Sequence, residues 1–261
     1  MEVLDSPFAR KLNTYLALSA GERKVLSELH RRRRRFPAGD GMVRQGYPNR
    51  TAYVLAEGWA CSYILLPDGG RQIVDFQIPG DFLGLRSVLF AKSNQAVEPI
   101  TVVQASEIIA SDLMAAFVET PRLFTAVMWA AACDESMLAD HLAGLGRRHS
   151  SVRMAHFLLV LGARLHLVGL ADKAGYACPL TQYHLADALG LSAVHVNRVL
   201  RELRETGLVT FQNGRVTYDD LDELVAFAGF DRDYLDDRAP HPRLIASSGA
   251  ANVWLRHLRE A

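Results

Sequence analysis

The fold is decided by residues 180–218, which read LTQYHLADALGLSAVHVNRVLRELRETGLVTFQNGRVTY. Thr181 can cap a first helix, because its hydroxyl accepts a hydrogen bond from a backbone N–H that has no partner inside the helix. Gly190 supplies the backbone freedom that a sharp helix end needs. Ser192 can cap a second helix, whose residues Val196, Val199, Leu200 and Leu203 form one apolar stripe. The stretch therefore predicts two helices separated by a tight turn.

Small and apolar residues in this stretch follow a specific spacing. Counting from Gln182, the fifth residue is Ala186, the ninth is Gly190 and the fifteenth is Val196. The small residue lets the second helix cross close to the first, the glycine makes the turn, and the valine packs underneath. This spacing is typical of the DNA-binding helix-turn-helix, and a hairpin with Asn213-Gly214 at its turn makes the motif winged. The competing interpretation is an ordinary helical hairpin within an enzyme.

Polar side chains that lie off the apolar stripe of the second helix are candidates for reading DNA. Arginine pairs with guanine O6 and N7, and asparagine suits adenine, so we expect His195, Asn197 and Arg198 to face base edges. Hydroxyls and helix N-termini suit phosphates. The expected DNA-binding residues are Thr181, Tyr183, Ser192, His195, Asn197, Arg198, Arg201, Asn213 and Arg215. The competing interpretation of each is a solvated helix face.

Composition limits the class of protein. The 29 basic and 29 acidic residues cancel, so any field that attracts nucleic acid must be local. The three cysteines, Cys61, Cys133 and Cys178, are widely spaced and predict neither a metal cluster nor a disulfide framework. The N-terminus lacks a secretory pattern, and no apolar run approaches about 18 residues. We therefore expect a cytoplasmic protein without a membrane partner or a cofactor.

The first third of the chain predicts a helix followed by short strands. Residues 12–29 have helical character, with Ser19 and Glu22 as a capping box. The five arginines at 31–35 predict a solvated strand or helix end, with DNA contact as the alternative. Candidate strands, broken by Gly and Pro, are residues 42–44, 51–56, 59–66, 71–78, 100–105 and 107–110. So many short strands favour a barrel or sandwich.

Residues 121–146 contain few helix breakers and predict a long helix. Phe124, Ala131, Leu138 and Leu145 recur every seven residues, as in the seam of a coiled coil. The companion row of Val127, Asp134 and His141 is largely polar, so packing of the helix against its own barrel is the alternative. The expected dimer interface is Phe124, Val127, Ala131, Leu138 and Leu145. A hinge is expected at 147–149.

The combination of a small β-roll, a long helix and a winged helix-turn-helix resembles the Crp/Fnr superfamily of bacterial transcription regulators. The helix-turn-helix carries this resemblance together with residues 66–84, LPDGGRQIVDFQIPGDFLG. It implies an α+β fold with a cyclic-nucleotide-binding-type roll. The implied domains are residues 1–120 for the roll with its N-terminal helix, 121–149 for the dimerisation helix and hinge, 150–230 for DNA binding and 231–261 for a tail.

The resemblance also implies a function. Family members act as homodimers on inverted repeats in double-stranded DNA and contact RNA polymerase. Arg198 falls where the family's base-reading arginine sits, whereas Ala193 and Val194 replace the Arg and Glu often found at the helix start. The half-site sequence therefore does not carry over. The alternative is a ligand-responsive module, for an unknown small molecule or haem, that acts through protein contacts. No pattern predicts an enzyme.

The expected effector pocket departs from the pattern of family members that bind cyclic AMP. Those members hold the cyclic phosphate with an Arg-Ser pair, and the corresponding positions here are near Ala96-Val97. We therefore predict that cyclic AMP does not bind in the usual way, with Arg86 as the one nearby cation. The candidate pocket residues are Gly80, Asp81, Phe82, Gly84, Arg86 and Leu138. The iron–sulfur branch is disfavoured because the first cysteine is Cys61.

Overall fold

The structure is a computed structural model that describes residues 6–84 and 89–231 of the 261-residue chain. Its first elements are two helices, α1 (Pro7–Tyr15) and α2 (Ala20–Leu29), where the sequence predicted one. The chain leaves the helical conformation at Leu16, which is extended, and Ser19 then starts α2. The predicted capping box is confirmed, since Ser19 and Glu22 each accept a hydrogen bond from the other's backbone N–H.

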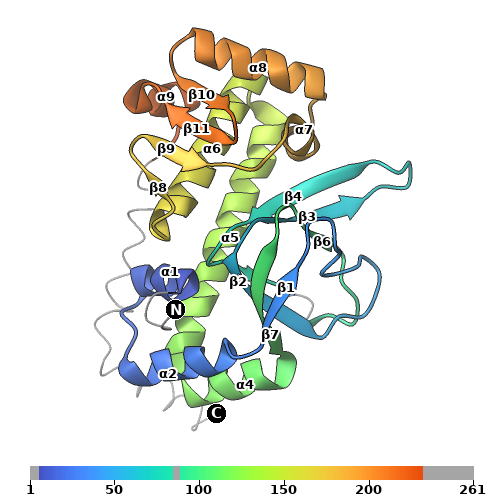
Figure 1. Ribbon diagram of the computed structural model, residues 1–261, viewed down its shortest axis with the longest axis vertical. Helices are drawn as coiled ribbons and strands as arrows, with labels where there is room; N and C mark the ends of the chain where they lie inside the picture. The colour runs from blue at the N-terminus through green and yellow to red at the C-terminus, as the bar shows by residue number, and fades with distance from the viewer. Residues whose placement is uncertain (1–5, 85–88, 232–261) are drawn as a thin grey trace, which may run out of the picture. The chain divides into compact units, whose positions relative to one another are not determined.

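Two antiparallel sheets follow (Figure 1). One has the order β1-β7-β2-β5 and the other the order β4-β3-β6. The strands are β1 (Arg33–Phe36), β2 (Thr51–Glu57), β3 (Ala60–Leu65), β4 (Arg71–Gln77), β5 (Phe82–Leu83), β6 (Ala96–Pro99) and β7 (Val103–Ile109). Both sheets contribute to one core, in which Tyr53, Leu55 and Val103 of the first sheet accompany Ala60 and Val97 of the second. The predicted small β-roll is confirmed.

Strand boundaries in the roll differ from the sequence expectation at residues 100–110 and at residues 42–44. The predicted pair of strands at 100–105 and 107–110 is a single strand, β7, because its pairing with β2 continues to Ile109. Residues 42–44 contribute an isolated bridge between Val43 and Val97 and no longer strand. Three of the five consecutive arginines lie in β1, where they are exposed, which agrees with the solvated strand.

Helices α4 (Ala110–Glu119) and α5 (Pro121–Arg147) follow the roll, and α5 confirms the predicted long helix. Pro121 is tolerated because it lies in the first turn of α5, where a backbone N–H has no helical partner. The chain turns at Arg148, which has an extended backbone, and continues as α6 (Ser150–Leu167). No helix in the described ranges is both long and apolar enough to cross a membrane.

The remaining described elements build the predicted winged helix-turn-helix. They are β8 (Ala171–Asp172), β9 (Gly175–Ala177), α7 (Gln182–Leu189), α8 (Ala193–Glu205), β10 (Val209–Gln212), β11 (Arg215–Tyr218) and α9 (Leu221–Ala228). The four strands form a sheet in the order β10-β11-β9-β8. Gly162 of α6 lies so close to the Tyr218 hydroxyl that a Cβ at this position would collide with it.

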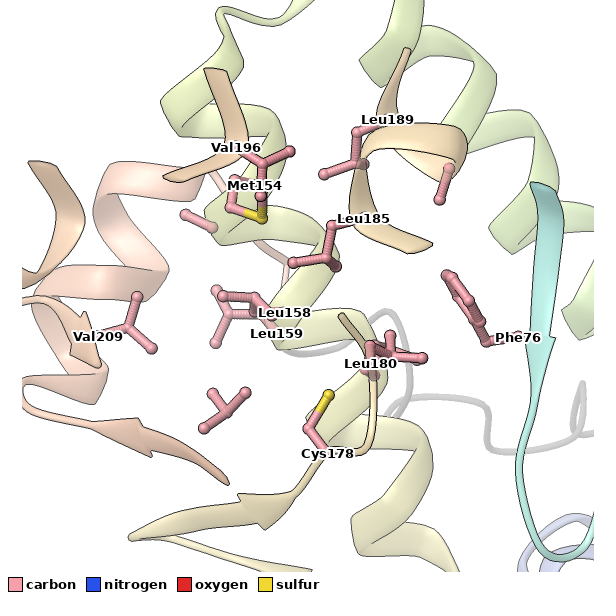
Figure 2. Close-up of a cluster of buried hydrophobic side chains, with 14 of the residues drawn as sticks. Phe76, Met154, Leu158, Leu159, Cys178, Leu180, Leu185, Leu189, Val196 and Val209 are labelled. Atoms are coloured by element: carbon pink, nitrogen blue, oxygen red, sulfur yellow. The ribbon is translucent and has the colours of Figure 1, made fainter. Parts of the chain in front are cut away.

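The core of this region connects α6 to α7 and α8. Figure 2 shows Leu185 and Leu189 of α7 and Val196 of α8 directed toward Met154 and Leu158 of α6. All five side chains are buried, which agrees with the predicted apolar stripes. The same cluster includes Phe76 of β4, so the apolar core continues from the helix-turn-helix to the roll.

Candidate nucleic-acid interface and effector cavity

The turn between α7 and α8 has the geometry that the sequence predicted. Gly190 adopts the left-handed conformation, with φ 61° and ψ 40°, and ends α7. Ser192 Oγ accepts a hydrogen bond from the His195 backbone N–H at 3.2 Å and so caps α8. Ala186 and Val196 are buried, as the helix crossing requires. The two helices are therefore held in a fixed relation by local caps and by a buried apolar contact.

Thr181 caps α7 in a reciprocal arrangement. Its hydroxyl accepts from the His184 backbone N–H at 3.4 Å, and His184 Nδ1 accepts from the Thr181 backbone N–H at 3.1 Å. Thr181 and Tyr183 are exposed at the start of α7, and Ser192 is exposed at the start of α8. Two helix N-termini with nearby hydroxyls are therefore accessible, which is an arrangement suited to phosphate oxygens.

The outward face of α8 carries cations that have no acidic partner. Asn197, Arg198 and Arg201 are exposed, and Val194 is 81% exposed. Across the described residues, neither Arg198 nor Arg201 forms a salt bridge. These guanidinium groups are therefore available to an external partner.

His195 is placed differently from the other predicted base-reading residues. It is half-buried, and its Nε2 lies 3.1 Å from Ser150 Oγ and 3.1 Å from Arg198 Nη2. The sequence placed His195 beside Arg198 on α8, but it held no signal for Ser150, which begins α6.

The wing confirms the predicted hairpin. Asn213 and Gly214 both have positive φ, 52° and 71°, the backbone that a two-residue hairpin turn of this type needs. Val209 to Gln212 pair with Arg215 to Tyr218 in register. Asn213 and Arg215 are exposed at the tip, so both are accessible to a DNA backbone.

The exposed side of α5 corrects one member of the predicted seam. Val127 is only 5% exposed and packs into the core of its own chain, so it is not a surface residue. Met128 and Leu142 are 47% and 69% exposed, and both were missed. With Phe124 and the half-buried Ala131, Leu138 and Leu145, they form an apolar row whose alternating spacings of four and three residues are interrupted by the exposed Glu135. The sequence signal for Met128 and Leu142 was the position four residues after Phe124 and Leu138, rather than three.

A cavity of about 540 Å³ lies among α1, β4, β5, α5 and α6. Four of the predicted pocket residues line it, namely Asp81, Phe82, Gly84 and Leu138. Gly80 does not, because it packs against Pro7 and Val168. Arg86 lies outside the described residues. Of the positions corresponding to the family's Arg-Ser pair, Ala96 is buried and Val97 is tied into backbone pairing with Val43.

A cluster of five charged residues at this cavity was not predicted, apart from Asp81. Lys11 Nζ lies 2.7 Å from Asp81 Oδ1 and 3.5 Å from Asp134 Oδ1. Arg164 reaches Asp81 Oδ2 at 2.7 Å and Asp75 Oδ1 at 3.0 Å. We refer to Lys11, Asp75, Asp81, Asp134 and Arg164 as the charge cluster. It joins α1, the roll, α5 and α6, which are distant in sequence.

The electrostatics of the charge cluster follow from two cations facing three carboxylates. Burial acts to raise the pKa of Asp81, but Lys11 and Arg164 outweigh it, so the pKa is lower than usual. At Asp75 and Asp134 burial dominates, and the pKa of each carboxyl is raised. Asp134 Oδ1 is buried without a hydrogen bond. Lys11 and Arg164 are therefore both paired with carboxylates of the same chain.

Strand β4 also touches α7 directly. Arg71 Nε donates to Asp187 Oδ2 at 2.6 Å, and Gln72 Nε2 donates to the Ala188 carbonyl at 3.0 Å. His141 of α5 lies 3.1 Å from the same carbonyl. These contacts use the side of α7 that carries Asp187 and Ala188 and leave Thr181 and Tyr183 exposed.

Comparisons with known proteins agree with this architecture. Residues 33–120 match the cyclic nucleotide-binding domain, and residues 152–227 match the Crp-like helix-turn-helix domain. The nitrogen fixation regulation protein FixK of Bradyrhizobium diazoefficiens is 31% identical over 213 residues, which span 81% of this chain and 88% of that protein. The chain belongs to the Crp/Fnr superfamily of transcription regulators.

Other relatives of this Crp/Fnr protein are consistent with that assignment. The transcriptional activator protein anr of Pseudomonas aeruginosa is 24% identical over 82% of the chain and 87% of its own length. The structure of FixK2 from Bradyrhizobium japonicum superimposes with a TM-score of 0.67 at 26% identity, covering 75% of this chain and 96% of that one. The protein is a DNA-binding transcription regulator with a cyclic-nucleotide-binding-like domain.

Proposed function

We propose that this regulator is a homodimer that recognises an inverted-repeat DNA site through α8. The observation that carries the proposal is the exposed face of α8, where Arg198 and Arg201 have no acidic partner among the described residues and the helix start is capped and accessible. Arginine on an exposed helix suits guanine in the major groove, where each base pair presents a distinct pattern. Tyr183, Thr181 and Ser192 are proposed for phosphates, with Asn213 and Arg215 of the wing on the backbone.

The dimer is proposed to form along α5. Phe124, Met128 and Leu142 are apolar and exposed in the single chain, and they lie on one side of the helix with Leu138 and Leu145. Apolar positions at alternating spacings of four and three bury each other when two helices pair. A two-fold dimer would present its two α8 helices to successive major grooves, about 34 Å apart.

The dimer is tested with Leu142→Glu, which places a charge in the proposed seam at a residue that is exposed in the single chain. We expect sedimentation to show a monomer at concentrations where the wild type is a dimer, with an unchanged circular dichroism spectrum. Leu65→Glu, at an exposed leucine of the roll, is the control and should remain dimeric. A dimeric Leu142→Glu protein would exclude this seam.

We further propose that the regulator does not depend on cyclic AMP. An anionic phosphate is stabilised by a cation with donor groups to spare. Lys11 and Arg164 are paired with Asp81, and the cavity also presents Asp75 and Asp134. Among the described residues, a phosphate placed there would meet carboxylates without a free countercharge. Calorimetric titration with cyclic AMP should therefore show no binding at millimolar concentration; saturable binding would contradict the proposal.

The DNA-binding function is tested by selecting fragments from a genomic library with purified protein, at a stated salt concentration and without added effector. We expect enrichment of an inverted repeat. Arg198→Ala should lose the sequence preference, while Arg23→Ala, on α2 away from this surface, should keep it. If no sequence is enriched either with or without cyclic AMP, the result would favour the second candidate function, which is described next.

The second candidate is a ligand-responsive module that acts through protein contacts, and the observation in its favour is the cavity of about 540 Å³. In either case we propose a cytoplasmic regulator that acts with RNA polymerase rather than an enzyme. Among the described residues there is no group of three or more His, Cys, Asp or Glu side chains that could hold a metal ion.

A further inference from the structure

We propose that His195 is a positioning residue for Arg198: its contribution to site recognition is a hydrogen-bond acceptor inside the protein rather than a contact with a base. The inference rests on the proposed function, since it concerns how α8 reads DNA. It departs from the sequence expectation, in which His195 faced a base edge itself.

The geometry begins with helical spacing. His195 and Arg198 are three residues apart on α8, so their side chains lie on one face of the helix. Arg198 Nη2 is 3.1 Å from His195 Nε2, within hydrogen-bonding distance. The ring is half-buried and lies next to Ser150, whose Oγ is also 3.1 Å from Nε2. The arginine thus extends from the helix with one of its nitrogens held at a defined place.

The chemistry of the two groups sets the direction of the bond. A guanidinium has only donors and stays protonated, so a ring nitrogen that contacts it must be the one without hydrogen. The proton of His195 therefore lies on Nδ1, and Nε2 accepts from Arg198. A neutral imidazole has a single acceptor nitrogen, so Ser150 and Arg198 both direct donors at the same lone pair. The edge of His195 that would address a base is already occupied within the protein.

The consequence for recognition is preorganisation. An unrestrained arginine side chain loses rotamer freedom when it is fixed, and this loss opposes binding. The bond to His195 restricts Arg198 before DNA arrives and leaves Nε, Nη1 and the second Nη2 hydrogen for guanine. In the described part of the chain Arg201 has no such hydrogen bond, although it is exposed on the same helix. This difference singles out Arg198 as the residue that discriminates between bases.

The test measures discrimination at each base pair of the selected site, as the ratio of affinities for the preferred and substituted bases. His195→Leu removes the acceptor and keeps an apolar body, and His195→Gln restores an acceptor oxygen. We expect His195→Leu to reduce discrimination about five- to tenfold at the same base pair where Arg198→Ala reduces it, which is within the range of one ordinary net hydrogen bond. His195→Gln should recover most of it. The double variant His195→Leu/Arg198→Ala should discriminate no less than Arg198→Ala alone.

Two controls separate positioning from a structural role. Ser150→Ala removes the other neighbour of Nε2 and should keep the preference, since Arg198 retains its acceptor. Affinity for nonspecific DNA and the unfolding midpoint should match the wild type in the two His195 single variants.

Three outcomes would overturn the proposal. The first is a loss of preference in His195→Leu at a different base pair from Arg198→Ala, which would mean that His195 contacts its own base. The others are additive losses in the double variant, or a loss in Ser150→Ala equal to that in His195→Leu. A wild type that discriminates nowhere would instead remove the regulator function on which the inference rests.

Discussion

The charge cluster at the cavity and the outer face of α8 both contain arginine side chains, which are buried and paired in the cluster and exposed on α8. In the charge cluster, Arg164 is buried and bonded to two carboxylates and a backbone carbonyl. On α8, Arg198 and Arg201 are exposed and have no acidic partner in the described structure. Residue type therefore does not decide whether an arginine serves the fold or an external ligand; its partners do.

The comparison also separates what each region contributes. A buried charge without a partner is unfavourable, so every cation of the charge cluster is matched and the cluster holds α1, the roll, α5 and α6 together. An exposed charge needs no partner, because water solvates it until DNA phosphates or base edges replace the water. The following predictions test that division, beginning with the largest expected effect.

Arg164→Met should lower the free energy of unfolding by about 3 kcal/mol, the lower end of the range for a broken buried pair, because Asp81 keeps Lys11 and Asp75 is partly exposed. Denaturant unfolding at fixed protein concentration measures this. Arg201→Met on α8 is the matched control and should change stability by less than about 0.5 kcal/mol. If both variants lowered the free energy of unfolding equally, the proposed difference between the buried and the exposed arginines would be wrong.

Arg198→Ala should lower base discrimination and leave stability nearly unchanged. We expect the unfolding free energy to stay within about 0.5 kcal/mol of the wild type, since the side chain is exposed. Discrimination at one base pair should fall by about 1 to 3 kcal/mol. Competition binding with single-base variants of the selected site measures the second quantity. A loss spread evenly over all positions would assign Arg198 to the phosphate backbone instead.

Asp134→Asn should stabilise the protein at pH 7, by less than the Arg164 variant destabilises it. Burial raises the pKa of Asp134 above its usual 3.8, so the folded state favours the protonated carboxyl, which Asn resembles. The favourable contribution of the wild-type carboxyl is fully present below pH 3.8 and is lost as pH rises through the raised pKa. The advantage of the variant should therefore shrink as pH falls toward 3.8.

Unfolding at pH 7 and at pH 4 measures this difference, with Glu119→Gln at an exposed residue of α4 as control. If Asp134→Asn is less stable at pH 7, the pairing of Asp134 with Lys11 outweighs its burial.

Arg215→Ala in the wing should have the smallest effect. The loss of one phosphate contact weakens binding to all sequences alike and reduces the slope of log affinity against log salt by about 1. The slope is measured by DNA-binding titrations at salt concentrations from about 50 to about 200 mM. An unchanged slope would place the wing away from the DNA.

Much of the fold could be predicted because it depends on neighbours along the chain. The caps at Ser19, Thr181 and Ser192, the left-handed Gly190 and the turn at Asn213-Gly214 each involve residues within one helical turn or one hairpin. Such local geometry follows from side-chain hydrogen bonds and backbone sterics. The sequence by itself determined the helix-turn-helix, its wing, the long helix and the outward position of Arg198.

Only the tertiary structure decided which side chains meet across long separations. Asp81 lies 70 residues from Lys11 and 83 from Arg164, and no periodic pattern connects them. The same holds for Ser150 beside His195, and for the burial of Val127 against its own core while Met128 faces outward. The physical reason is that burial, desolvation and charge pairing depend on how elements pack, whereas caps and turns are settled within a few residues.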